Sequence, residues 1–170
     1  MTFLRLTALL ALLTTLTTLT NPASAQTAAP ATSESRDAAT AYIGTTNFVV
    51  GRVARDCLVV LGRTETPQDF VAVWQQRNAK YMMASQKYME VRFGEAEKAG
   101  GAEMRDTVMG ELRAAVRREG ESAVKSLLDS PDKHDGCKRA VTIIESGAYD
   151  FSPGIPIFGE LESLRAWAQR

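Results

Sequence analysis

The chain has 170 residues with 20 basic and 20 acidic side chains, one histidine and two cysteines. This even balance argues against nucleic acid as a partner, because such binding needs clustered Lys and Arg to displace counterions, and it gives no polybasic signal for a membrane surface. Beyond residue 25 no segment is apolar enough to cross a bilayer, so we expect no membrane span after that point.

Residues 1–25 have the pattern of a secretory signal peptide. A short region with the basic residue Arg5 precedes an apolar run over residues 6–19, and Asn21-Pro22 then breaks any helix. Ala23-Ser24-Ala25 has the small-x-small form at which signal peptidase cleaves. We therefore expect a periplasmic or secreted chain of about 145 residues. An N-terminal membrane anchor is the alternative, but the run is shorter than the ~20 apolar residues that a span needs.

The expected cleavage leaves a chain with two parts. Residues 26–39 are rich in Ala, Thr and Ser and lack a sustained apolar period, which predicts a disordered leader. Residues 40–170 are of a size that suits one helical domain. Because the signal peptide removes Arg5 and no acidic residue, the mature net charge is −1.

Steps of three and four between apolar residues predict an all-α fold, a four-helix bundle-like domain with a short additional C-terminal helix. Thr66-Pro67 is a strong helix start, since threonine caps and proline suits the first helical position. Gly94, and more firmly Gly100-Gly101, should end the second helix, and Gly120 could interrupt or kink the third. The expected helices cover residues 40–63, 66–93, 102–128, 135–145 and 160–168.

Two glycines of the first expected helix, Gly44 and Gly51, are seven residues apart and share a face. Glycine weakens a helix, so their presence suggests that another helix approaches closely there. The apolar residues of the tail, 151–158, are expected to pack back onto the bundle.

Cys57 and Cys137 fall on the apolar stripes of the first and fourth expected helices. An exported chain with an even number of cysteines usually oxidises them, so we predict one disulfide between these helices. Two buried free thiols, or a bridge between chains, are the alternatives. A loop of this length corresponds to about 4–5 kcal/mol of stabilisation in the chain-entropy treatment.

His134 is the only histidine and lies three residues before Cys137, between Asp132 and Asp135. A small enzyme could use Cys137 as nucleophile with His134 as base, and a metal or cofactor carrier could use the same side chains as ligands. We favour a structural role, because Asp and Gly are typical of helix starts and a disulfide consumes the thiol.

No cofactor is predicted. The motifs of thioredoxin-like redox centres, c-type haem attachment and phosphate-binding loops are absent from the sequence. Methionines could serve as axial haem ligands, but scattered helical methionines are usually core filler. The methionines concerned are Met82, Met83, Met89, Met104 and Met109.

The segment around Asn78 is the candidate binding site. Asn78 lies on an apolar stripe between Trp74 and Tyr81, and a buried asparagine needs hydrogen-bond partners. It could anchor a loop or another helix. Otherwise Trp74, Arg77, Asn78 and Tyr81 could line a groove for a partner, since Trp, Tyr and Arg are enriched at binding hot spots. A second basic group, Arg113, Arg117 and Arg118, is expected to face solvent.

These patterns favour a non-catalytic exported protein that acts by binding an unidentified protein partner in the cell envelope. An inhibitor or an immunity-type partner of a secreted enzyme would fit this description. The alternative is the small periplasmic enzyme or metal or cofactor carrier centred on His134.

Overall fold

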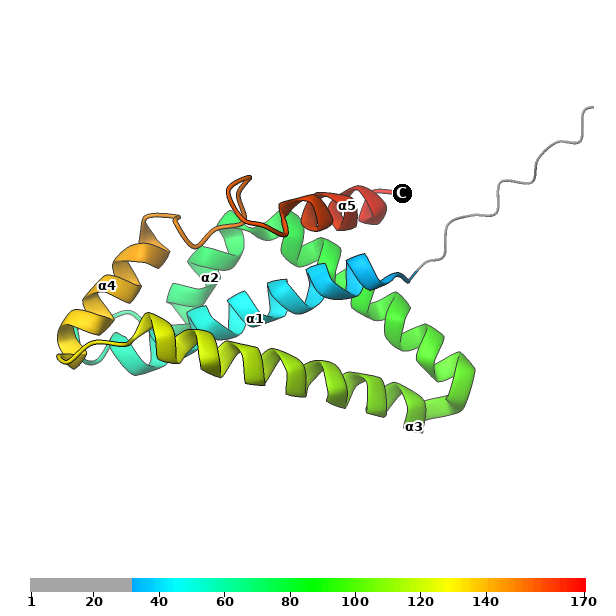
Figure 1. Ribbon diagram of the computed structural model, residues 1–170, viewed down its shortest axis with the longest axis horizontal. Coiled ribbons are helices and arrows are strands. Elements are labelled where there is room, and N and C mark those ends of the chain that lie inside the picture. Colours follow the sequence, from blue (N-terminus) through cyan, green and yellow to red (C-terminus); the bar gives the residue numbers. More distant parts are fainter. Residues whose placement is uncertain (1–31) are drawn as a thin grey trace, which may run out of the picture.

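The computed structural model describes residues 32–170, so the predicted signal peptide and residues 26–31 of the predicted leader lie outside the described residues. All regular structure in this part of the chain is helical, which confirms the all-α prediction (Figure 1). None of these helices combines the length and apolar character needed to cross a membrane. The helices are α1 (Glu34–Cys57), α2 (Pro67–Arg77), α3 (Ala79–Leu127), α4 (Lys133–Glu145) and α5 (Phe158–Ala168).

Helix α1 begins six residues before the predicted boundary at residue 40, so the predicted leader over 26–39 overlaps its first turns. Ser33 caps the helix by accepting a hydrogen bond from the Arg36 backbone N–H at 3.3 Å. Tyr88 of α3 donates a hydrogen bond to Asp37 at 2.8 Å, and Ala39 is fully buried. These contacts order a stretch whose own sequence has little helical pattern.

The predicted helix over residues 66–93 is divided at Asn78, which has non-helical backbone angles (φ −104°, ψ 15°). Helix α2 begins as predicted, with the Thr66 side chain accepting from the Asp69 N–H and Pro67 in the first turn. The break follows from the Asn78 side chain, which binds groups outside its own helix.

Helix α3 consists of two straight arms that meet at a sharp bend. Gly100 and Gly101 leave the helical conformation, and Gly101 has a φ of 71°, which only glycine adopts without strain. We call residues 79–99 the first arm and residues 102–127 the second arm. Gly120, at which the sequence allowed an interruption, keeps helical backbone angles, so the second arm is continuous there.

Helix α1 lies between the two diverging arms of α3 (Figure 1). Its approach to the second arm is close, because a Cβ added at Gly44 would lie 3.1 Å from Val116 and one added at Gly120 would overlap the ring of Phe48. The expected close helix approach at Gly44 is therefore confirmed. Gly51 instead faces Val71 of α2, at 4.0 Å from its Cβ position.

The predicted disulfide joins Cys57, the last residue of α1, to Cys137 of α4, and both cysteines are buried. It spans 80 residues of sequence. Helix α5 buries Leu161 and Leu164 against α1 and the first arm. The tail packs back onto the helices as expected, with Phe151 buried.

Candidate functional site

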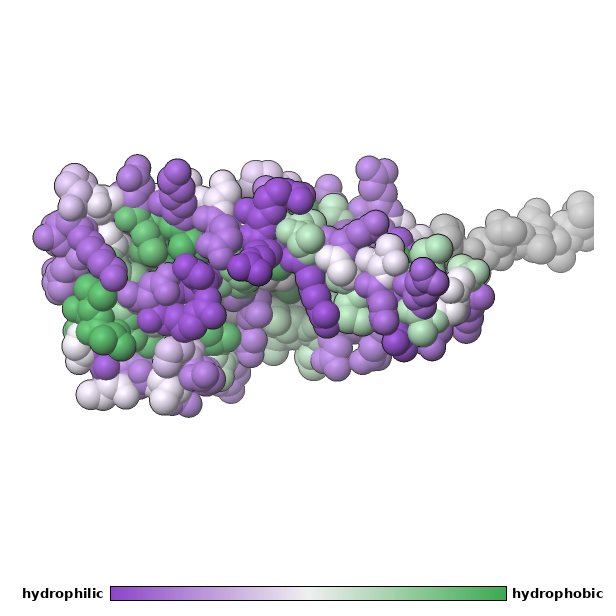
Figure 2. All heavy atoms as spheres, turned by 90° about the horizontal axis from the view of Figure 1, so that it is seen from below, coloured by the Kyte–Doolittle hydropathy of each residue, from purple (hydrophilic) through white to green (hydrophobic). Residues whose placement is uncertain are grey.

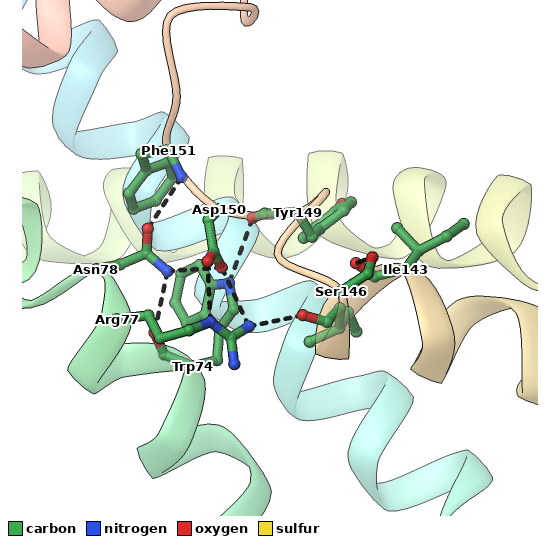
Figure 3. Close-up of polar contacts among 9 residues, drawn as sticks. Trp74, Arg77, Asn78, Ile143, Ser146, Tyr149, Asp150 and Phe151 are labelled. Atoms are coloured by element: carbon green, nitrogen blue, oxygen red, sulfur yellow. Dashed lines mark hydrogen bonds and ion pairs between the residues drawn. The ribbon is translucent and has the colours of Figure 1, made fainter.

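The end of α2 holds the segment 149–151, which follows α4 (Figure 3). Arg77 donates to both carboxylate oxygens of Asp150, at 2.9 and 3.2 Å, and to the backbone carbonyl of Ile144 at 2.6 Å. Asn78 donates to Asp150 at 3.0 Å and accepts from the Phe151 N–H at 2.9 Å. The Trp74 indole N–H donates to the Tyr149 carbonyl at 3.3 Å. Three nearby residues of one helix end thus fix three successive residues of the tail.

Phe151 lies in an aromatic cluster beside this anchor. Its ring meets those of Trp74 and Tyr81 edge-on, at centroid distances of 5.5 and 5.4 Å. Tyr42 of α1 completes the cluster at 6.0 Å. Such edge-to-face contacts add to the energy of burial. The polar anchor and the ring cluster therefore position the same residue from two sides.

Of the four residues expected to line a partner groove, Trp74 and Arg77 line the cleft described below, whereas Asn78 and Tyr81 do not. Trp74, Asn78 and Tyr81 are 0%, 2% and 1% exposed, so they are interior residues. The alternative role for Asn78, an anchor for a loop, is the one that the structure shows. Arg77 is partly exposed but holds Asp150.

Tyr81 extends from the core to a polar group on α5. Its hydroxyl donates to Glu162 at 2.6 Å. Burial, followed by this hydrogen bond, raises the pKa of Tyr81 to about 12. The hydrogen bonds from Arg165 and then from Tyr81 lower the pKa of Glu162. Tyr81 therefore stays neutral and serves as a donor at ordinary pH.

A small cleft lies next to the anchor, and we call it the α2–α4 cleft. It has a volume of about 250 Å³. Its base is made by buried Phe70, Trp74 and Ile144, whereas Val73 at the rim is 56% exposed. Charged residues also line it, namely Arg63, Glu65, Asp69, Arg77 and Glu145.

Most of the charged residues at the rim of the α2–α4 cleft form ion pairs, Arg77 with Asp150 outside the cleft. Arg63 contacts Glu65 and Glu145 at 2.6 and 2.7 Å and so links the turn before α2 to the end of α4. These bonds raise the pKa of Arg63, Glu145 having the larger effect, and lower the pKa of Glu65. Asp69 differs from the others, since it accepts a hydrogen bond from the Thr66 hydroxyl at 2.7 Å and has no ion pair among the described residues. A neutral side chain can enter this apolar depression without separating the ion pairs at its rim.

Figure 2 shows that apolar side chains also gather at one end of the molecule, the end at which the turn after α1 lies. Val59 in this turn is 83% exposed, and its neighbours Val60 and Leu61 are half-buried. Gly62, with a φ of 65°, closes the turn. Val59 does not line the α2–α4 cleft.

The region around His134 forms the start of α4. Asp132 caps the helix by accepting from the Asp135 N–H at 3.1 Å. Cys137 is bonded to Cys57, so it can act neither as a nucleophile nor as a thiolate ligand. Asp132, His134 and Asp135 could offer ligand atoms within 4.8 Å of one another, but all three are exposed and one already serves as the cap.

Comparisons with protein-family models, with curated proteins and with solved structures find no significant match to this chain. The candidate site therefore depends on geometry alone. Sequence reasoning missed Phe70, Val73 and Ile144 as cleft residues. The sequence feature that could have indicated the cleft is Val73, an apolar residue that lies outside the helical stripe of Phe70 and Trp74.

Proposed function

We propose that this protein is a non-catalytic, exported binding protein whose α2–α4 cleft receives an apolar side chain of a protein partner. The exposed position of Val73 at the rim of a cleft with an aromatic and aliphatic base is the observation that supports this most. Binding hot spots typically combine a small desolvated pocket with surrounding contacts that exclude water.

The rigidity of the cleft also supports a binding role. The Arg77–Asp150 pair and the Arg63–Glu145 pair tie its walls together, and the disulfide fixes α4 to α1. A preformed surface loses little conformational freedom on association, which improves affinity. An inhibitor or an immunity-type protein needs a rigid docking surface of this kind.

Export is part of the proposal. The expected signal peptide over residues 1–25 and the disulfide are both compatible with an oxidising compartment outside the cytoplasm. The alternative is an enzyme or a carrier centred on His134. It is less favoured, because the disulfide leaves Cys137 without a free thiol to act as nucleophile or ligand.

The test is retention of a partner from cell-envelope extract on the immobilised mature chain. Val73→Asp places a charge at the cleft rim on an already exposed residue, so it should abolish retention and leave the circular dichroism spectrum unchanged. Val59→Asp is the matched control, since Val59 is also exposed and lies outside the cleft. Equal loss with both variants, or no specific retention by the wild type, would contradict the proposal.

A further inference from the structure

A long apolar trough runs along α1 between the two arms of α3. It consists of two hollows with volumes of about 580 and 340 Å³. Thr40, Met89 and Leu112 line both hollows, so the two lie next to each other along α1. We call the whole feature the α1–α3 trough. Along α1 it extends from Glu34 to Asn47, about 20 Å at the helical rise.

The lining of the trough is mainly apolar and rich in methionine. The sequence predicts these methionines as core filler, but Met83 is 65% exposed, and Met82 and Met89 are half-buried. Flexible thioether side chains adapt to ligands of varied shape. The apolar lining of the larger hollow comprises Ile43, Met82, Met83, Met89, Leu112 and Val116.

Charge is distributed unequally between the two hollows. Among the residues that the structure describes, Arg113 is the only charged one that lines the larger hollow. Within residues 32–170 it forms no ion pair or hydrogen bond, whereas Arg105 and Arg118 on the same arm are paired with acids. The smaller hollow carries three acids, Glu34, Asp37 and Glu111, and one arginine, Arg92, which lies 3.5 Å from Asp37.

This distribution of charge favours a ligand with an anionic group in the larger hollow. An anionic group in the larger hollow would meet an arginine with all its donors free, and an arginine binds a carboxylate through two parallel hydrogen bonds. The acids of the smaller hollow disfavour an anion there but leave its apolar lining available. The hollows also fall in the range of about 300–1,000 Å³ that is typical of small-molecule sites.

We propose that the α1–α3 trough binds a fatty acid, with the carboxylate paired to Arg113 and the acyl chain extending along α1 toward the smaller hollow. Within residues 32–170 one free arginine lines the larger hollow, which matches the single charge of a carboxylate. The trough shares no lining residue with the α2–α4 cleft, so this site goes beyond the protein-binding role and stands independently of it.

The experiment compares three probes of equal chain length on the disulfide-bonded mature chain: dodecanoate, dodecanol and dodecyltrimethylammonium. Calorimetric titration below the micellar concentrations should give one bound dodecanoate per chain. The neutral alcohol should bind about tenfold more weakly, because it lacks the charge-assisted hydrogen bonds. The cation should bind more weakly still.

Variants assign the head group to Arg113. Arg113→Ala should weaken dodecanoate binding about tenfold and leave dodecanol binding unchanged. Arg117→Ala is the matched control, since Arg117 on the second arm is also exposed and has no ion pair with any described residue, but does not line the trough. Met83→Glu places a negative charge at an exposed position on the rim. It should also weaken the binding of dodecanoate, without affecting the fold.

Several results would overturn the proposal: no dodecanoate binding, equal binding of acid and alcohol, or full affinity in Arg113→Ala. Tighter binding of dodecyl phosphate than of dodecanoate would indicate a phosphate ligand and would overturn the fatty-acid proposal as well. The proposal would also be overturned if the molecular mass in solution were that of a dimer and the trough were buried in its interface. Val73→Asp should leave dodecanoate binding unchanged, so failure of the protein-binding role and failure of this one are distinguishable.

Discussion

Asn78 and Phe151 are 73 residues apart in the sequence and joined by a buried hydrogen bond, in which the Asn78 side-chain oxygen accepts from the Phe151 N–H at 2.9 Å. The same amide donates to Asp150 and to the Trp74 carbonyl. One side chain thus ends α2, positions the tail and supports a wall of the α2–α4 cleft.

Asn78→Ala should lower the free energy of unfolding by about 2–3 kcal/mol, because it leaves the buried Phe151 N–H without a partner. Asn78→Asp should cost at least as much at neutral pH, since it places a second carboxylate beside Asp150. Urea unfolding measures both. Asn47→Ala is the control, because its half-buried bond to Gln75 should contribute less. Equal costs for Asn47→Ala and Asn78→Ala would show that the anchor is not needed.

The features that the sequence predicts well are those with local causes. Thr66 and Asp132 cap the helices that they precede, and Gly101 bends the chain through its own backbone freedom. The helical stripes of Cys57 and Cys137 place both cysteines in the interior, where they are bonded.

The features that the sequence does not predict depend on distant partners. The break at Asn78 requires Asp150 and Phe151, and the early start of α1 requires Tyr88. The α1–α3 trough is missed for the same reason. Arg113 is solvent-facing as expected, but its place in an otherwise uncharged hollow follows only from the packing of α1 between two arms.

Two threonines of α1 allow a matched test of buried hydroxyl groups. The Thr40 hydroxyl is buried and has no hydrogen-bond partner within residues 32–170, whereas the Thr46 hydroxyl donates to the Tyr42 carbonyl at 2.9 Å. Thr40→Val should raise the free energy of unfolding by about 1 kcal/mol, because it removes an unsatisfied group. Thr46→Val should lower it by a similar amount. Both changes keep the branched shape, so thermal unfolding compares the hydroxyl groups directly. Destabilisation by Thr40→Val would contradict this account.

Two glycines of the second arm should respond to alanine in opposite ways. A Cβ at Gly120 would overlap the Phe48 ring, so Gly120→Ala should destabilise the protein by about 1–2 kcal/mol despite the better helix propensity of alanine. Gly110 is exposed, and no described residue lies within 4 Å of its Cβ position, so Gly110→Ala should stabilise the protein by about 0.5–1 kcal/mol.

A double-mutant cycle separates the steric cause from other effects of Gly120→Ala. Chemical denaturation of Phe48→Ala with and without Gly120→Ala should show that most of the cost disappears when the ring is absent. An undiminished cost in the Phe48→Ala background would mean that the close helix approach is not what selects glycine here.

Two buried tyrosines should make the fold sensitive to alkaline pH. Burial is the main cause that raises the pKa of Tyr81 and of Tyr88 to about 12, and hydrogen bonds to Glu162 and Asp37 add to it. An unfolded chain releases these protons near pH 10. Because the folded state then holds more protons than the unfolded state, stability is fully present below pH 10 and falls as the pH rises toward 12.

The free energy of unfolding of the wild type, measured by urea denaturation at pH 9 and pH 11, should therefore be lower at the higher pH. Replacing both residues, Tyr81→Phe and Tyr88→Phe, should make this decrease smaller, because two groups that favour unfolding at alkaline pH are gone. The phenolate absorbance of the folded wild type should show ionisation near pH 12 that is missing from the double variant. An identical decrease in the two proteins would mean that other groups control the alkaline transition, and that the phenols of Tyr81 and Tyr88 ionise in the folded chain as readily as in the unfolded one.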